Sequence, residues 1–114
     1  KMKKRVVKKP WGGFIRFTLN EKSTVKILVV KRRQKFSLQY HKKRSEFWKV
    51  IDNPVRITLG KKKFVARRGD EIFIPKKTLH RAEAFSKTVH ILEISFGKFD
   101  EKDIARVEDD YGRA

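Results

Sequence analysis

The sequence contains no cysteine, which excludes a disulfide framework and any metal site built from thiolates. It has no apolar run near the roughly 20 residues that cross a membrane, and its basic start does not resemble a signal peptide. We therefore expect a cytoplasmic protein with no membrane partner. Internal repeats and low-complexity linkers are also absent, and 114 residues suffice for a single domain with a core but not for two.

Acidic residues are scarce: 13 Asp and Glu stand against 31 Lys and Arg, which gives a formal net charge of +18. Such a charge attracts anions such as sugar phosphates, nucleotides and nucleic acids. The basic clusters fall at turn-like places, which favours a solvated surface of the kind found in proteins from hot environments. A nucleic-acid-binding barrel would interleave aromatic and basic side chains on one sheet face. The nine phenylalanines stand mostly at apolar strand positions instead, so specific nucleic-acid binding is not expected.

Short alternating segments separated by Gly, Pro, Asn or charged residues predict an all-β domain, an antiparallel sandwich or barrel. Eight strands are expected at residues 13–20, 24–32, 35–41, 46–52, 55–60, 62–67, 70–75 and 88–99. A further strand is expected to begin at His80 after a short turn. Residues 59–63, between the strands expected at 55–60 and 62–67, predict a tight hairpin.

The two ends of the chain depart from this pattern. Residues 1–9 form a basic arm that could add an edge strand or cross to a partner subunit. Gly12 and Gly13 are expected to form a turn that lets the first strand enter the barrel. Residues 100–114 are predicted to form a short C-terminal helix and a tail, with Asp100 as the helix N-cap.

Polar side chains stand within segments that otherwise alternate like buried strands. Gln39 and His41 share one face of their strand, Glu46 returns toward them after a turn, and His80 begins a later strand. Burying such groups is costly unless a hydrogen-bond network or a metal satisfies them. One amide oxygen, two imidazoles and one carboxylate suit a divalent ion (Zn, Mn, Fe, Co or Ni) and leave room for water or substrate. The alternative is a polar network in a barrel without metal.

The spacing of these residues resembles the two motifs of the cupins, β-barrels of the double-stranded β-helix or jelly-roll type. The first motif is a His-any-His pair followed by Glu, matched here by Gln39, His41 and Glu46 with Gln in the first place. The second motif contributes Gly69, Pro75 and His80. The resemblance implies a cupin fold over residues 1–114 and one divalent metal ion, held by Gln39, His41, Glu46 and His80.

Nearly the whole chain resembles the type II mannose-6-phosphate isomerases, in which such a cupin is often the C-terminal domain of a mannose-1-phosphate guanylyltransferase. The similar stretches are residues 9–14, 37–48, 74–84, 92–97 and 103–113. The resemblance implies metal-dependent aldose–ketose isomerisation of mannose 6-phosphate and fructose 6-phosphate, within GDP-mannose and polysaccharide precursor metabolism. Guanylyl transfer is not expected, because no glycine-rich nucleotide loop is present.

The sequence departs from the family at Lys43 and Phe47, where histidines are usual. These changes favour an alternative, a non-catalytic cupin that binds a sugar phosphate or nucleotide sugar and associates with a separate guanylyltransferase. The expected partners of the isomerase are a phosphorylated hexose and a second copy of the chain in a homodimer.

Individual roles can be assigned by the same resemblance. The expected catalytic residues are Glu46 and Arg113, and the expected phosphate ligands are Arg81, Arg113 and Lys43. Each arginine could instead form an ion pair. The candidate partners are Glu83 or Glu93 for Arg81, and Asp109 or Asp110 for Arg113.

Overall fold

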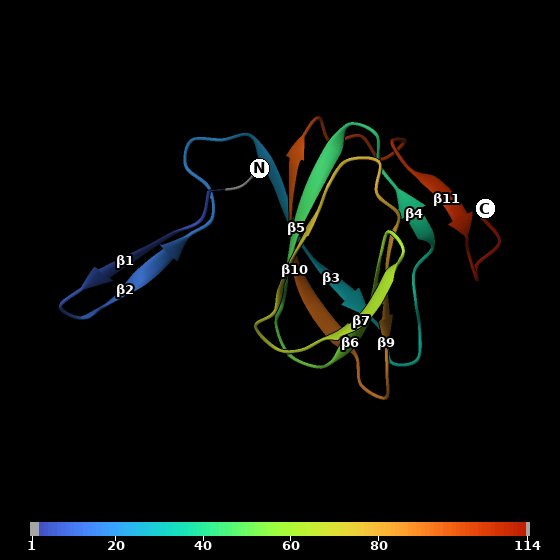
Figure 1. Ribbon diagram of the computed structural model, residues 1–114, viewed down its shortest axis with the longest axis horizontal. Helices are drawn as coiled ribbons and strands as arrows, with labels where there is room; N and C mark the ends of the chain where they lie inside the picture. The colour runs from blue at the N-terminus through green and yellow to red at the C-terminus, as the bar shows by residue number, and fades with distance from the viewer. Residues whose placement is uncertain (1–2, 114) are drawn as a thin grey trace.

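Two facing β-sheets and one separate hairpin make up the fold (Figure 1). The computed structural model describes residues 3–113. Every regular element in these residues is a strand, and no helix is long and apolar enough to cross a membrane. The strands are β1 (Arg5–Lys9), β2 (Gly12–Arg16), β3 (Ser23–Val30), β4 (Leu38–Tyr40), β5 (Arg44–Val50), β6 (Val55–Leu59), β7 (Lys62–Ala66), β8 (Glu71–Ile74), β9 (His80–Ala84), β10 (Val89–Gly97) and β11 (Ala105–Glu108).

The two sheets are antiparallel throughout, in the orders β3-β10-β5-β8 and β11-β4-β9-β6-β7. The predicted all-β class is therefore confirmed. Most predicted strands lie within a few residues of observed ones, and β9 begins at His80 as expected. The strand predicted at 35–41 is the shortest in the structure, at three residues. The expected hairpin at 59–63 joins β6 to β7 through Gly60, whose φ of 60° suits a two-residue loop.

The inward faces of both sheets form one apolar core. Trp48, Ile57, Ile74 and Ile91 are its largest fully buried apolar side chains. Successive strand residues point to opposite faces, so β5 turns Trp48 inward and Phe47 outward. A second, smaller cluster lies on the outer face of the four-stranded sheet and consists of Phe47, Ile94 and Phe96, covered by Phe17.

The predicted C-terminal helix is wrong. Residues 105–108 form β11, which pairs with β4 through Ala105 and Tyr40 and through Arg106 and Gln39. Without β11 the short strand β4 would expose unpaired backbone groups at the edge of its sheet, and strand pairing satisfies them. Asp100 does accept a hydrogen bond from a backbone N–H, that of Lys102, but the turn it caps leads into a strand.

The predicted entry of residues 13–20 into the barrel is also wrong. β2 pairs with β1 in a hairpin of its own, which projects away from the barrel in Figure 1. Gly13 lies in β2 with φ of 147°, and a Cβ there would collide with the carbonyl oxygen of Val7 on β1. Glycine therefore allows close pairing within the hairpin, and the first barrel strand is β3.

Truncating the core should destabilise the fold strongly. Ile57 is fully buried, so we expect Ile57→Ala to lower the free energy of unfolding by about 2–5 kcal/mol, because it removes buried methyl groups and leaves a cavity. Urea unfolding followed by tryptophan fluorescence measures the change. Val65→Ala on the neighbouring strand β7 is the matched control, since Val65 is exposed and its truncation should cost no more than about 0.5 kcal/mol. Equal losses in the two variants would contradict this placement of the core.

Candidate metal centre

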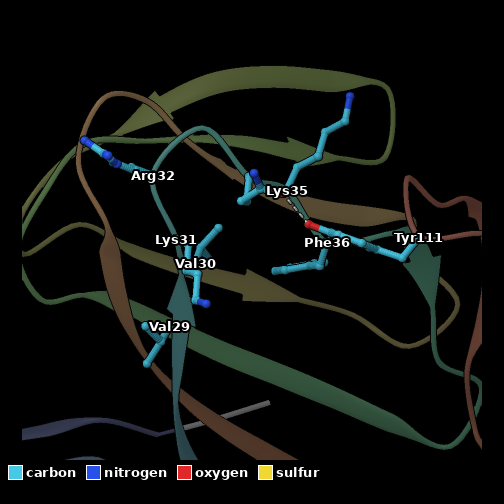
Figure 2. Close-up of a pocket in the computed structure, with 8 residues that line it drawn as sticks. Val29, Val30, Lys31, Arg32, Lys35, Phe36 and Tyr111 are labelled. Atoms are coloured by element: carbon cyan, nitrogen blue, oxygen red, sulfur yellow. Dashed lines mark hydrogen bonds between the residues drawn. The ribbon is translucent and has the colours of Figure 1, made fainter.

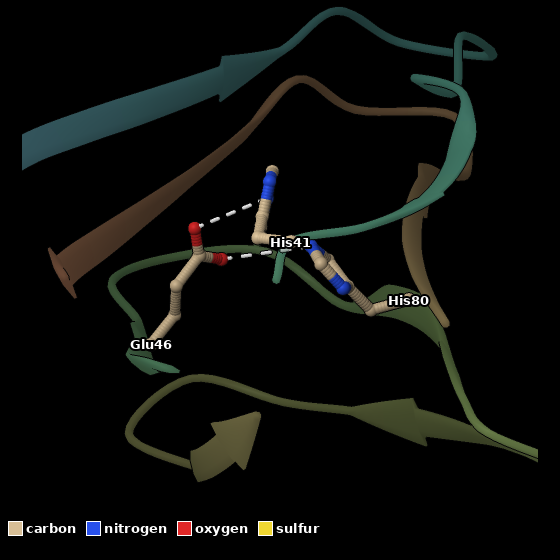
Figure 3. Close-up of side chains that lie close together, drawn as sticks. All are labelled: His41, Glu46 and His80. Carbon is tan, nitrogen blue, oxygen red and sulfur yellow. Dashed lines mark ion pairs between the residues drawn. The ribbon is translucent and has the colours of Figure 1, made fainter. Parts of the chain in front are cut away.

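Three strands bring the polar residues together at one end of the barrel interior. Gln39 on β4 is the register partner of His80 on β9, and His41 directly follows β4. Glu46 on β5 lies in the other sheet and faces them. Figure 3 shows His41, Glu46 and His80 pointing toward one another from these separate segments.

The distances within this group are short. Glu46 Oε2 lies 3.4 Å from His41 Nε2, and Glu46 Oε1 lies 3.6 Å from His80 Nε2. The candidate ligand atoms of the three residues all lie within 4.8 Å of one another, and each residue is at most 3 % exposed. Together the three buried side chains offer a possible site for one metal ion.

Both imidazoles are oriented by backbone carbonyl groups. His41 Nδ1 lies 2.7 Å from the carbonyl oxygen of Asp103, and His80 Nδ1 lies 2.9 Å from that of Thr78. A carbonyl oxygen can only accept a hydrogen bond, so the proton of each neutral ring resides on Nδ1. Both Nε2 atoms therefore carry the lone pair, which is the tautomer that a metal ligand requires.

Two buried atoms at the centre lack hydrogen-bond partners within the described part of the chain: Glu46 Oε1 and His80 Nε2. Both are acceptors, and leaving such groups unsatisfied in the interior costs about 1–3 kcal/mol each. A cation between them would satisfy both at once. The donor set therefore fits a divalent ion that accepts nitrogen and oxygen ligands.

Gln39 lies beside the centre, with its amide reversed relative to the expected oxygen ligand. Its Oε1 accepts a hydrogen bond of 2.6 Å from Ser37 Oγ, and its Nε2 lies 3.5 Å from His41 Nε2. Rotating the amide by 180° would turn the oxygen toward the centre. The hydroxyl of Ser37 could then accept from the amide NH₂ group, because a hydroxyl both donates and accepts.

Arg44 is a part of the centre that the sequence interpretation missed. Its buried guanidinium donates to Glu46 Oε2 at 3.2 Å and lies 3.3 Å from His41 Nε2. A further bond to the carbonyl oxygen of Asp100 and the ring of Phe99 hold it in place. Arg44 stands two residues before Glu46, so alternation alone places both on the inner face. For His41 Nε2 to bind an ion, the guanidinium of Arg44 would have to move away from it.

Glu93 is the second missed residue. It lies on β10, and with Glu46, His41 and Trp48 it lines a cavity of about 80 Å³. Ser95 Oγ donates to it at 3.2 Å, and Lys26 Nζ lies 3.9 Å away. Burial, and next the negative charge of Glu46, raise the pKa of Glu93 to about 7. In the sequence, the polar residues Glu93 and Ser95 stand two apart within an otherwise apolar strand, and this pattern could have identified Glu93 as a site residue.

The other predicted site residues do not line this cavity. Arg81 is buried and donates to the carbonyl oxygen of Phe36 and to Glu108, so its acidic partner is neither of the two expected from the sequence. Arg113 forms the ion pair with Asp109 that was the alternative to a catalytic role. Lys43 is exposed in the turn between β4 and β5, and its backbone N–H donates to Asp103.

Phe47, the other departure from the family pattern, is turned away from the centre. Its ring packs against Phe17 at 5.4 Å on the outer face of the sheet. The two positions where the family usually has histidine are therefore outside the cavity, one in a turn and one in the outer cluster. The differences leave the inner donor set unchanged.

A larger groove adjoins the cavity. It has a volume of about 650 Å³ and is lined by Val29, Val30, Lys31, Arg32, Gln34, Lys35, Phe36 and Tyr111 (Figure 2). Phe36 lines both spaces, and its ring packs edge-on against Trp48, which in turn packs against His80. A cationic groove thus lies next to the wall of the buried centre.

Comparison with known proteins places the chain in a family. Residues 1–109 match the family model described as the C-terminal part of mannose-6-phosphate isomerase. The chain belongs to this family. It is 33 % identical over 109 residues to the alginate biosynthesis protein AlgA of Pseudomonas aeruginosa, covering 94 % of this chain and 23 % of AlgA. It is 32 % identical over 111 residues to the mannose-1-phosphate guanylyltransferase ManC of Salmonella typhimurium, covering 96 % of this chain and 24 % of ManC.

Solved structures support the fold. A cupin protein from Bacteroides fragilis superimposes with a TM-score of 0.61 at 18 % identity, covering 75 % of this chain and 74 % of that one. The expected cupin fold is therefore confirmed. The chain spans about a quarter of the length of AlgA and ManC, so the activities of those whole proteins do not transfer to it directly.

The buried histidines predict how stability depends on pH in the metal-free protein. Burial lowers the pKa of His80 to about 4 and also lowers that of His41. An unfolded histidine titrates near 6.5, so between about pH 6.5 and 4 an unfolded His80 binds more protons than the folded one, and its contribution to stability falls as the pH falls. The raised pKa of Glu93 contributes in the opposite direction over the same range, so the contribution of His80 is read from the difference between two variants. We expect His80 to contribute a loss of about 2–3 kcal/mol between pH 7 and 4.5.

Urea unfolding at several pH values, with chelator present, measures this contribution. The variant His80→Leu removes the titrating ring at similar volume, so it should lose less stability than the wild type over the same range. Parallel curves for the two proteins would show that His80 is not buried in its neutral form.

Proposed function

We propose that this chain is a metal-dependent aldose–ketose isomerase that interconverts mannose 6-phosphate and fructose 6-phosphate. The observation that carries the proposal is the pair of unsatisfied acceptor atoms, Glu46 Oε1 and His80 Nε2, which lie 3.6 Å apart in the buried centre. Glu46 also lines a cavity together with a second carboxyl group, Glu93. Membership of the isomerase family supports the reaction class. Relatives named for alginate and xanthan biosynthesis are consistent with a role in polysaccharide precursor metabolism.

The ligands in this proposal are His41, Glu46 and His80, joined by Gln39 after rotation of its amide. A divalent cation at that position would polarise the substrate carbonyl group and stabilise the negative charge of an enediolate. Once Glu46 serves as a ligand, it is no longer the best candidate for moving protons.

Glu93 takes the proton-transfer role instead. It is the remaining carboxyl group in the cavity, and Ser95 fixes its orientation. In the direction from mannose 6-phosphate, its carboxylate accepts the proton from C2 and returns it to C1, while the hydroxyl proton passes from O2 to O1. The product is fructose 6-phosphate, and no oxidant or further reactant is needed. The indole N–H of Trp48, which lacks a protein partner among the described residues, is available to a sugar oxygen.

In this proposal the substrate extends from the cavity past Phe36, the residue that lines both spaces, into the groove. About 80 Å³ accommodates an ion with one or two waters, since a water occupies about 30 Å³, but not a hexose phosphate. The neighbouring groove of about 650 Å³ is large enough, and Lys31, Arg32 and Lys35 line it. We assign the phosphate group to this groove, because cationic side chains in a partly enclosed space attract and hold a dianion.

Metal binding can be tested separately from catalysis. We expect one Zn²⁺ or Mn²⁺ ion per chain, measured by elemental analysis after dialysis and by calorimetric titration of the apoprotein. His80→Ala should weaken binding at least roughly 100-fold, because a direct ligand is lost. His90→Ala is the matched control: it removes the remaining histidine, which pairs with Asp52 away from the centre. Equal weakening by both substitutions, or no binding by the wild type, would refute the ligand set.

Isomerase activity tests the proposed roles. With metal bound, the wild type should convert fructose 6-phosphate to mannose 6-phosphate in a coupled assay. Glu93→Gln should lower kcat by roughly 100-fold or more while retaining the metal, because the amide cannot accept the proton. Replacing Lys31, Arg32 and Lys35 by alanine should mainly raise KM, whereas alanine at Lys61, Lys62 and Lys63, equally basic but on the β6–β7 hairpin, should change it little.

A metal-loaded protein that does not turn over would overturn the isomerase proposal. If mannose 6-phosphate still raised its melting temperature, the result would instead support the alternative, a non-catalytic sugar-phosphate-binding cupin.

A further inference from the structure

Arg44 places a permanent positive charge among the proposed metal ligands. Its side chain is 7 % exposed, its Nε donates to Glu46 Oε2 at 3.2 Å, and its Nη2 lies 3.3 Å from His41 Nε2. Because the proton of His41 resides on Nδ1, Nη2 is the donor in that contact. A guanidinium keeps its charge at every ordinary pH. Arg44 therefore holds one oxygen and one nitrogen that the ion would need.

The guanidinium and a divalent ion cannot use these atoms at the same time. A ligand nitrogen or oxygen donates a lone pair to Zn²⁺ from a distance of about 2.0–2.2 Å. His41 Nε2 has a single lone pair, and Arg44 Nη2 uses it. Two cations beside one buried carboxylate also repel each other strongly. Ion binding through His41 therefore requires the guanidinium to leave.

The other side of the centre is open while Arg44 is in place. Glu46 Oε1 and His80 Nε2 lie 3.6 Å apart and have no hydrogen-bond partner among the described residues. The hydrogen bonds of Arg44 within the centre go to Glu46 Oε2 and His41 instead. The two open acceptors can therefore meet an ion first, and His41 joins them only after the guanidinium has moved.

The surroundings of Arg44 allow its side chain to move while its backbone stays fixed. Arg44 begins β5 and is the register partner of Gly97, where a Cβ would collide with the neighbouring backbone. On its other side the guanidinium donates from Nη1 to the carbonyl oxygen of Asp100 at 3.1 Å and lies 4.4 Å from the ring centroid of Phe99. Neither contact involves a proposed ligand. Both can therefore keep the guanidinium partly paired after it leaves the centre.

We propose that Arg44 is an internal counter-ion that exchanges with the metal. In the apoprotein its guanidinium neutralises Glu46, and when the metal binds it leaves Glu46 and His41 but keeps its contacts with Asp100 and Phe99. Arg44 therefore stabilises the metal-free fold and lowers the affinity for the metal. This exchange depends on the metal site of the proposed function but not on isomerase activity.

The sign of one change in affinity distinguishes this role from a supporting one. A guanidinium that only holds Glu46 in position for the ion would favour metal binding, so its removal would weaken binding. A guanidinium that competes with the ion has the opposite effect, and its removal strengthens binding.

Calorimetric titration of the whole chain with Zn²⁺ measures this sign, at about pH 8, where both imidazoles are neutral. Arg44→Met keeps an unbranched side chain without the charge, and should lower the dissociation constant roughly tenfold or more, because a charge-assisted hydrogen bond no longer has to be broken. Lys26→Met is the matched control. Lys26 lines the same cavity and lies 3.9 Å from Glu93, so its loss removes one positive charge without touching a ligand. It should change the constant less than about threefold.

Urea unfolding tests the counter-ion role of Arg44 in the apoprotein. With chelator present, Arg44→Met should lower the midpoint by about 1 M or more, because the buried carboxylate of Glu46 loses its partner. With saturating Zn²⁺ the difference from the wild type should become much smaller, since the ion then neutralises the carboxylate. A purely structural role for Arg44 would give the same difference in both conditions.

The movement of the guanidinium can be followed in the wild type by NMR. The Nε–H resonance of Arg44 is identified by its loss in Arg44→Lys, which keeps the buried charge. Addition of one equivalent of Zn²⁺ should shift this resonance and speed the exchange of its proton with water, because the bond to Glu46 is broken. This measurement does not depend on the folding of Arg44→Met, and an unchanged resonance in the zinc-loaded protein would overturn the proposal.

The outcomes separate the exchange from the proposed function. Zinc binding by Arg44→Met that is no tighter than that of the wild type would overturn the exchange and leave the metal site intact, as would an equal gain in Lys26→Met. Binding by Arg44→Met but not by the wild type would support the exchange and refute the metal-dependent isomerase. No binding by either protein would overturn both.

Discussion

The centre is built around a carboxylate that is almost fully removed from water. Glu46 lies between two neutral imidazoles and one guanidinium, and only one of its oxygens is hydrogen-bonded. A buried negative charge is costly unless positive charge and donors surround it. Arg44 supplies that charge in the structure as described, and a metal ion would supply more of it. The backbone carbonyl groups of Asp103 and Thr78 orient the two imidazoles around this carboxylate. The pKa of Glu93 is raised first by its burial and then by the charge of Glu46.

The C-terminal segment supports this arrangement from outside the barrel. Asp103 accepts hydrogen bonds from the backbone N–H groups of Lys42 and Lys43, and its carbonyl group fixes the His41 ring. The carbonyl group of Asp100 holds the guanidinium of Arg44. A helix over this segment would have used these backbone groups internally, so the extended course of the tail is what makes them available. The incorrect helix prediction therefore concerns a segment with a direct role in positioning the centre.

Strand alternation and motif spacing were sufficient to place Gln39, His41 and Glu46 on the inner face. They could not supply the register that sets Gln39 opposite His80, because register depends on pairing between distant segments. Arg44 has the same alternation as Glu46, yet in a chain with 31 basic residues an arginine in a basic run is interpreted as surface charge. For the tail, Asp100 was predicted as a helix N-cap, but it accepts a hydrogen bond within a turn, and the open edge of β4 decided what followed that turn.

The prediction for residues 13–20 was wrong for the same physical reason as the prediction for the C-terminal tail. Residues 13–20 have strand character, but local pattern does not identify the partner of a strand, and β2 pairs with β1 instead of joining the barrel.

The four-stranded sheet connects the centre with the outer apolar surface. β10 and β5 direct Glu93 and Glu46 inward, while Ile94 and Phe47 point to the outer face. Because β3 pairs with β10 along eight residues, anything that stiffens the open edge of β3 also restrains the backbone that carries Glu93. In the proposed mechanism, proton transfer and ion binding would depend on the separation of Glu93 and Glu46, which in turn depends on the register of this sheet.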